Sequence, residues 1–376
     1  MRRLIAILLV TVSCAPSLSS QSRYKLASET IVSKPEELKR LQGNRIYRIA
    51  GYNSGQIVYQ LRQDSKFSGY AYSDEAATKL YYDERMGKVV DTVAIERRGR
   101  SVYDFIQIDD LTLYRGKYQL PLDCLDLNKD DLDRTELDRV DELLDYQDFW
   151  IEVNGKEKKI KSFSSDYYDV DLYYNICYTG DCVTLNDYVS EYLRSTEADS
   201  IITVFSVQNG QVTSKELYCR ECIAPQIVNE QLFYGKKFFY FPGTDAYDWK
   251  VYRASKFDLP KSELLAEYIE ILLVSPDGKY ILGKKNLQGK DVAVILDVEA
   301  KKFDYLLGRD YLTYKYFYSP TYKKFAFDTQ DHIIYINNPV EFPFNSVGED
   351  AERKRTSKSE KAEFWKNYIH PELQQE

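Results

Sequence analysis

The cysteines are the residues whose type and spacing are best suited to chemistry. Four of them form two close pairs, Cys177 with Cys182 and Cys219 with Cys222. Two such pairs could chelate zinc through four thiolates, whereas in an oxidising compartment the same residues form disulfides. The spacing does not distinguish local bridges from bridges that cross between the pairs. We predict disulfides among these four cysteines and a buried thiol at Cys124.

The first residues of the chain indicate the compartment. A basic start at Met1 to Arg3 is followed by an apolar run, Leu4 to Val12, that is too short to span a bilayer. A small residue, Ser13, then precedes Cys14. This order is typical of an export signal, so we expect the protein to work outside the cytoplasm.

The cleavage position decides whether the mature protein is anchored. The segment from Leu9 to Cys14 resembles a bacterial lipoprotein signal, although Thr11 stands where that family usually carries Leu. The resemblance implies a signal peptide of residues 1–13, lipidation of Cys14 and membrane attachment through that lipid only. The alternative is an ordinary cut after Ser19, which gives a signal peptide of residues 1–19 and a soluble secreted chain. Residues 14–33 are expected to form a tether.

Residues 122–148 form an acidic insert, with eleven acidic and three basic side chains. Apolar residues at helical spacing predict a helix from Thr135 to Tyr146. The stretch 126–136 resembles an EF-hand calcium loop, in which oxygen ligands at alternate positions surround the cation. It is one residue shorter than that loop and carries Asp131 in place of the glycine at the sharp turn.

The EF-hand resemblance implies a set of calcium ligands. These would be Asp126, Asn128, Asp130 and Asp133, with Glu136 as the closing bidentate ligand. The alternative is an ordinary helix start, in which Asp133 is the N-cap and Glu136 completes a capping box. Calcium is the one cofactor that the sequence indicates.

Composition and missing motifs exclude several classes of function. A net charge of −8 without a concentrated basic segment argues against a nucleic-acid partner. Two histidines, His332 and His370, leave little for a His-rich metal site or a His-based triad. The sequence contains no phosphate-binding Gly-rich loop, dinucleotide fingerprint or Gly-x-Ser-x-Gly elbow. The 34 tyrosines favour half-buried strands, where the ring packs and the hydroxyl stays hydrated.

Most of the chain has the pattern of β structure. Short alternating runs between residues 44 and 119 predict a meander of antiparallel strands. The turn Asn209-Gly210 between two further alternating runs predicts a hairpin. Helices are expected only at 34–41, in the acidic insert and at 359–368.

An internal repeat near the C-terminus indicates the architecture. The pairs Ser275-Pro276 and Ser319-Pro320 lie 44 residues apart, which is the length of one four-stranded propeller blade. The segments around them resemble WD-type and Tol-type β-propeller repeats of extracytoplasmic bacterial proteins, whose Ser-Pro-Asp-Gly-Lys turn matches Ser275 to Lys279. The second copy has Thr321-Tyr322 where Asp-Gly would stand. The resemblance implies a mainly β fold, a propeller of six or seven blades over residues 34–345 and a charged C-terminal tail, 346–376.

These features favour a noncatalytic binding or scaffold protein of the cell envelope, either lipid-anchored or secreted. The loops of a propeller converge on two broad faces that can hold proteins or glycans, so we expect a protein or glycan partner. One alternative is a carbohydrate-active propeller enzyme with a catalytic carboxylate pair. Among 59 acidic residues, the sequence does not single out such a pair. The other alternative is a surface adhesin stiffened by the calcium loop.

Overall fold

The computed structural model describes the chain from Ala27 to Asn337 with several gaps. The described ranges are 27–43, 45–63, 78–95, 100–118, 146–164, 171–177, 180–188, 199–220, 222–239, 247–255, 257–287 and 289–337. Within them, the strands form four four-stranded sheets and one eight-stranded sheet. None of the helices in these ranges is long and apolar enough to cross a bilayer.

The eight-stranded sheet consists of two blades that are joined at their innermost strands. The first blade contains β2 (Arg45–Asn53), β3 (Gln56–Gln63), β4 (Thr78–Asp83) and β5 (Lys88–Ala94). The second blade contains β6 (Arg100–Ile108), β7 (Leu111–Tyr118), β8 (Tyr146–Val153) and β9 (Lys156–Ser164). Strands β2 and β6 run parallel, with Gly51 opposite Gln107 and Tyr52 opposite Ile108.

Three further blades are antiparallel meanders of four consecutive strands. The third contains β10 (Asp171–Ile176), β11 (Cys182–Tyr188), β12 (Asp199–Gln208) and β13 (Gln211–Arg220). The fourth contains β14 (Cys222–Val228), β15 (Gln231–Phe239), β16 (Tyr247–Ser255) and β17 (Glu263–Glu267). The fifth contains β18 (Glu270–Val274), β19 (Tyr280–Leu287), β20 (Lys290–Asp297) and β21 (Lys302–Tyr305).

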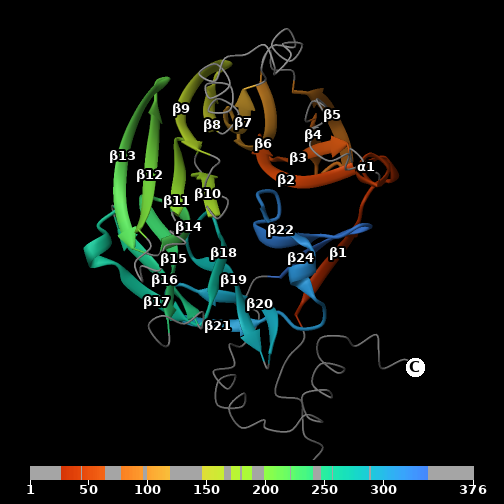
Figure 1. The fold of residues 1–376 in the computed structure, drawn as a ribbon. Coiled ribbons are helices and arrows are strands. Elements are labelled where there is room, and N and C mark those ends of the chain that lie inside the picture. Colours follow the sequence, from red (N-terminus) through yellow and green to blue (C-terminus); the bar gives the residue numbers. More distant parts are fainter. Residues whose placement is uncertain are drawn as a thin grey trace, which may run out of the picture.

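The sixth blade combines both ends of the described chain. It contains β22 (Lys315–Ser319), β23 (Lys324–Asp328) and β24 (His332–Ile336), and β1 (Glu29–Ser33) pairs with β24 as its outer strand. Helix α1 (Glu36–Gln42) follows β1, and short 3-10 helices lie at η2 (Leu259–Lys261) and η3 (Tyr311–Thr313). The six blades that the described strands form surround a common centre (Figure 1), which confirms the predicted mainly β propeller. Six is the lower of the two expected numbers of blades.

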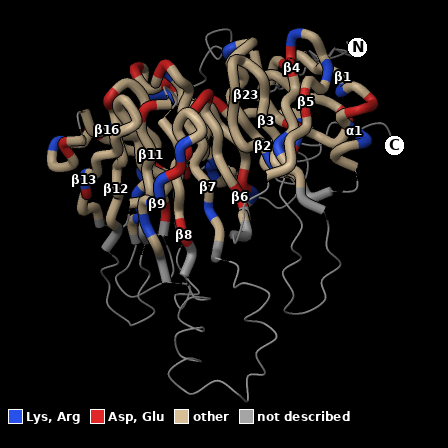
Figure 2. The backbone as a smooth tube through the Cα atoms, turned by 90° about the horizontal axis from the view of Figure 1, so that it is seen from above, with Lys and Arg blue, Asp and Glu red and all other residues tan. Residues whose placement is uncertain are grey.

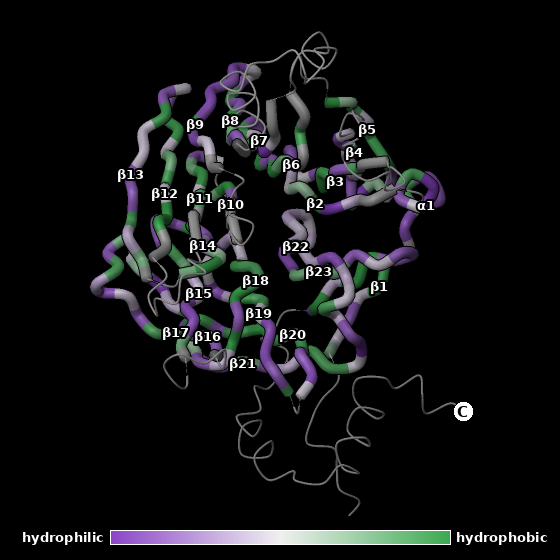
Figure 3. The backbone as a smooth tube through the Cα atoms, viewed as in Figure 1, coloured by the Kyte–Doolittle hydropathy of each residue, from purple (hydrophilic) through white to green (hydrophobic). Residues whose placement is uncertain are grey.

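Six hydrophobic clusters of buried residues hold the blades together, one between each pair of neighbours. Because successive side chains of a strand point to opposite faces of the sheet, a single strand contributes residues to two clusters. In β19, for example, Ile281 packs between the fourth and fifth blades, whereas Leu282 packs between the fifth and sixth. Strands near the axis are therefore apolar on both faces: β18 is hydrophobic over most of its length, whereas β13 at the periphery is mostly hydrophilic (Figure 3). Full burial of each such side chain contributes about 1.5–3 kcal/mol.

The two Ser-Pro turns show how the repeat is stabilised. The Ser275 hydroxyl is buried, donates to Asp277 Oδ1 at 2.7 Å and accepts from the Tyr280 amide at 2.9 Å. Ser319 is equally buried but donates to Glu84 Oε2 at 2.7 Å, and Glu84 belongs to the β4–β5 turn of the first blade. The neighbouring blade thus provides the carboxylate that the second copy of the repeat lacks.

The expected boundaries need two corrections. Residues 14–33 were expected to form a tether, but Glu29–Ser33 is strand β1, because its backbone pairs with the edge of β24. The acidic insert was expected to reach residue 148, but Tyr146 already begins β8, and the buried Asp148 accepts from Ser162 at 2.5 Å. The predicted helices at 135–146 and 359–368 lie essentially outside the described residues. The early helix is confirmed as α1.

A buried ion pair lies where the ring closes. Lys34, which directly follows β1, contacts the Asp328 carboxylate at the end of β23, and both side chains are fully buried. Lys34 Nζ also donates to Gln42 Oε1 at 2.8 Å and to the Thr329 carbonyl at 2.5 Å. Burial disfavours both charges, so it lowers the pKa of Lys34 and raises the pKa of Asp328, while their mutual attraction opposes both shifts.

Removing one partner of this pair should cost far more stability than removing both. We expect Lys34→Met to lower the free energy of unfolding by about 3–5 kcal/mol, because it leaves Asp328 buried and uncompensated. The double variant Lys34→Met/Asp328→Leu should recover a large part of that loss. Urea denaturation of the wild type, the two single variants and the double variant measures the coupling free energy between Lys34 and Asp328. Lys39→Met, which removes an exposed pair with Glu36, is the control and should change the midpoint little. Additive losses in the double variant would contradict this prediction.

Candidate functional site

A cavity of 190 Å³ lies on the axis of the propeller. Its wall comes from the innermost strand of every blade, namely β2, β6, β10, β14, β18 and β22. Most of the lining is aliphatic, as at Ile49, Ile176 and Val274. Apolar concavities with a few placed polar groups are the usual form of a binding site, so this cavity is the candidate functional site.

Gln226 connects the wall across two blades. Its Oε1 accepts from the Val274 amide at 2.8 Å, and its Nε2 donates to the Leu272 carbonyl at 3.2 Å. The fourth and fifth blades are therefore joined by a side-chain amide that mimics a strand-to-strand hydrogen-bond pair. Because both ends of this amide are engaged, Gln226 fixes the shape of the wall.

Arg48 performs a similar task between the first two blades. Its Nε donates to Gln60 Oε1 at 2.6 Å, and Nη2 donates to the Phe105 carbonyl. Asp104 lies 3.8 Å from Nη1. The positive charge at the cavity wall is thus already compensated by the neighbouring blade.

Three tyrosines and Asn175 give the cavity its remaining polar character. The Tyr52 hydroxyl accepts from the Tyr318 amide at 3.1 Å, which joins the first blade to the sixth. Burial raises the pKa of Tyr318 to about 12, so its hydroxyl stays neutral at physiological pH. Tyr316 is 37% exposed and is the most accessible of the three rings.

The cavity lining lacks the groups that hydrolysis requires. Among the described residues that line it there is no Asp, Glu, His, Ser or Cys. A glycosidase needs two carboxyl groups on either side of the scissile bond, and a triad needs a nucleophile and a base. The described lining therefore offers no support for the carbohydrate-active alternative.

Charged side chains elsewhere are scattered and of mixed sign. Seen from the side of the ring, positions of Lys and Arg are interspersed with positions of Asp and Glu along the described backbone (Figure 2).

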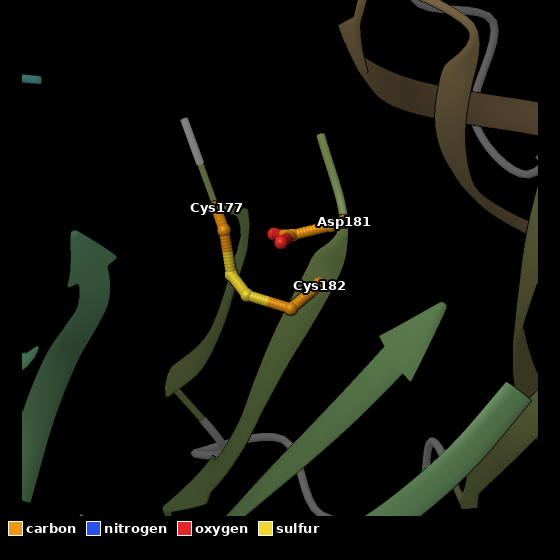
Figure 4. A group of neighbouring side chains, drawn as sticks. All are labelled: Cys177, Asp181 and Cys182. Carbon is orange, nitrogen blue, oxygen red and sulfur yellow. A yellow bond between two sulfur atoms is a disulfide. The ribbon is translucent and has the colours of Figure 1, made fainter. Parts of the chain in front are cut away.

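The structure brings together the cysteines of each close pair. Cys177 is joined to Cys182, with Cα atoms 5.1 Å apart, and Cys219 to Cys222, with Cα atoms 5.6 Å apart. Both separations lie within the range that disulfides adopt. Asp181 lies beside the first pair (Figure 4). The pairing is local, which selects one of the two arrangements that the spacing left open.

The strand register separates the two pairs. Cys182 lies opposite Ser206 on β12, whereas Cys219 lies opposite Ser200 on the same strand. Six residues of a strand span roughly 20 Å. A single zinc ion therefore cannot be held by all four thiolates, and the zinc alternative in that form is wrong.

Two other predicted sites lie outside the described residues. These are the lipidation site at Cys14 and the calcium ligands, and Cys124 lies outside as well. The calcium ligands are Asp126, Asn128, Asp130, Asp133 and Glu136. All of them stay predictions.

The cavity wall was not predicted from the sequence. In each blade, the wall residues lie on the strand nearest the axis, as do Ala50 on β2 and Ile227 on β14. The sequence signal for these residues is the first apolar run of each blade. This run identifies the innermost strand only once the boundaries of the blades are known.

The chain has low similarity to known proteins. No protein family and no curated protein matches its sequence. The β-propeller domain of the Trilobed protease from Pyrococcus furiosus is 10% identical, with a TM-score of 0.44 over 75% of this chain and 78% of that one. A putative TolB from Agrobacterium tumefaciens is 8% identical, with a TM-score of 0.46 over 84% of this chain and 100% of that one. The tricorn protease is 12% identical, with a TM-score of 0.43 over 79% of this chain, which spans only 26% of that protease.

Replacing Gly51 tests how closely the backbones of the first two blades must approach each other at the cavity wall. Its φ is +129°, and a Cβ there would overlap the Gln107 carbonyl oxygen. We expect Gly51→Ala to lower the free energy of unfolding by about 2–4 kcal/mol through backbone strain and steric overlap. Gly55, in the same hairpin, has φ +82° but open space around it. Gly55→Ala should therefore cost only about 1 kcal/mol, and equal losses in denaturant titrations would refute the steric argument.

Chemical labelling tests the cysteine pairs. We expect alkylation of the unfolded, unreduced protein to leave Cys177, Cys182, Cys219 and Cys222 unmodified, because each sulfur is bonded within its pair. Mass spectrometry of the digest should show the two local cross-links and no crossed ones. Labelling of all four residues without a reductant would show that the bridges do not form.

Proposed function

We propose that this chain is a noncatalytic binding protein of the cell envelope that takes up an apolar group of a protein partner in its central cavity. The observation that carries the proposal is the wall itself. It is built from all six blades, is mainly aliphatic and lacks acids and nucleophiles among its described residues. A wall of this composition is suited to binding a ligand without catalysing a reaction on it.

The size of the cavity indicates what it accepts. A protein cavity of about 150 Å³ takes up benzene, so 190 Å³ accommodates one aromatic or large aliphatic side chain. Arg48 and Gln226 are engaged by neighbouring blades and offer few free polar groups for sugar hydroxyls. A polypeptide side chain therefore fits this wall better than a glycan does.

The envelope location is supported by the N-terminal sequence and by the cysteine pairs. A lipid on Cys14 would be the only contact with the membrane. Strand β1 begins at Glu29, fifteen residues further on, and that length of extended chain reaches about 50 Å. The anchored propeller could then meet partners well beyond the lipid headgroups.

The calcium-stiffened adhesin is not favoured by any feature of the described residues. Calcium binding by the segment 126–136 stays a prediction, independent of the cavity.

Replacing one tyrosine at the cavity should strongly reduce partner capture. We expect Tyr316→Ala to reduce partner recovery at least about tenfold in a cross-linking pull-down from envelopes of the native host, because interface aromatics commonly account for 2 kcal/mol or more. Tyr218→Ala is the matched control, since Tyr218 is 72% exposed on the peripheral strand β13. It should recover the partner normally. Equal recovery by both variants would place the binding surface away from the cavity.

A further inference from the structure

We propose that Cys177, Asp181 and Cys182 form a redox-gated site for a thiophilic divalent cation such as Zn²⁺. In the oxidised protein, the two sulfur atoms are bonded to each other and cannot act as thiolate ligands. In the reduced protein, the same hairpin presents two thiolates and a carboxylate. The proposal does not depend on the function of the cavity.

The ligand atoms are already grouped closely enough to share one ion. The two sulfur atoms and a carboxylate oxygen of Asp181 all lie within 4.8 Å of one another (Figure 4). Zinc binds sulfur at about 2.3 Å and carboxylate oxygen at about 2.0–2.2 Å in a tetrahedron. Reduction lets the sulfur atoms separate by the small distance that such a shell requires. Three protein ligands leave the fourth position to water.

The backbone of the hairpin is held by hydrogen bonds that do not involve sulfur. The Cys177 amide donates to the Cys182 carbonyl, and the Gly180 amide donates to the Cys177 carbonyl, each at 2.8 Å. The Val207 amide donates to the Asp181 carbonyl, also at 2.8 Å, which fixes the hairpin to β12. The three ligand residues therefore stay in place when the disulfide is reduced, and ordering them costs the cation little.

The three ligand residues differ in exposure. Cys177 and Cys182 are 3% and 7% exposed, whereas Asp181 is exposed. A cation would enter past the carboxylate and reach sulfur atoms that are shielded from bulk solvent. Among the described residues, no such ligand group forms around Cys219 and Cys222, so the second pair provides an internal control.

A dithiol can act as the reductant of the Cys177–Cys182 disulfide. The dithiol delivers two electrons and two protons to the Cys177–Cys182 bond and itself becomes a disulfide. The bond breaks to two thiols, which release their protons to solvent when the cation binds. Reoxidation by a small-molecule disulfide, which takes up the two electrons, and two protons from solvent, to become a dithiol, reforms the Cys177–Cys182 bond and releases the cation.

Cobalt provides a spectroscopic test, because thiolate ligation to Co²⁺ gives a charge-transfer band in the near ultraviolet. The full chain is reduced with dithiothreitol, freed of reductant under argon and titrated with Co²⁺, and alkylation confirms the number of free thiols. We expect a thiolate band that saturates at one Co²⁺ per chain in the reduced protein and no band in the oxidised protein. Circular dichroism should show the same β signal in both states.

The variants assign the ligands. Cys219→Ser/Cys222→Ser should keep the band, Cys177→Ser/Cys182→Ser should lose it, and Asp181→Asn should weaken Co²⁺ binding at least about tenfold. A band of full intensity in Cys177→Ser/Cys182→Ser would overturn the proposal. So would reduced wild-type protein without a band, an Asp181→Asn variant with unchanged affinity, or a Cys177–Cys182 bond that stays intact in dithiothreitol.

Discussion

Pairing of β1 with β24 is the interaction on which the ring depends. It joins residues as far apart as Glu29 and Ile336, and the sixth blade has only three strands without it. Forming a contact across so long a segment costs loop-closure entropy before it yields any stabilisation. The buried pair of Lys34 and Asp328 adds its attraction at this position, and α1 then places Leu38 in the cluster between the sixth and first blades.

Closure of the ring also defines the cavity. Three polar side chains of the wall each connect two neighbouring blades: Arg48 the first and second, Gln226 the fourth and fifth, and Tyr52 the sixth and first. These side chains hold the wall only while the blades keep their order around the axis. The same bonds that stabilise the ring therefore preorganise the cavity, which would limit the entropy lost on binding the side chain that we propose as its ligand.

Features set by local chemistry could be predicted from the sequence, and features set by distant pairing could not. The turn at Asn209-Gly210 was predictable because both residues take a positive φ, as a two-residue hairpin requires. The strand at 29–33 was missed because its partner lies some 300 residues away. Likewise, nothing near Ser319 shows that Glu84 replaces the missing aspartate. The cavity wall belongs to the second group, since six separate blades contribute to it.

The disulfide in the Cys177–Cys182 hairpin is not needed to hold the hairpin together. A bridge over so short a loop removes about half as much entropy from the unfolded chain as a bridge over 100 residues removes. Three backbone hydrogen bonds already fix the turn, each contributing about 0.5–1.5 kcal/mol. A Cβ added at Gly180 in this turn would lie 3.6 Å from Ile108 Cγ2, and Ile108 lines the cavity, so the hairpin lies near the cavity wall. Its sulfur chemistry can therefore change close to the cavity while the ring stays closed.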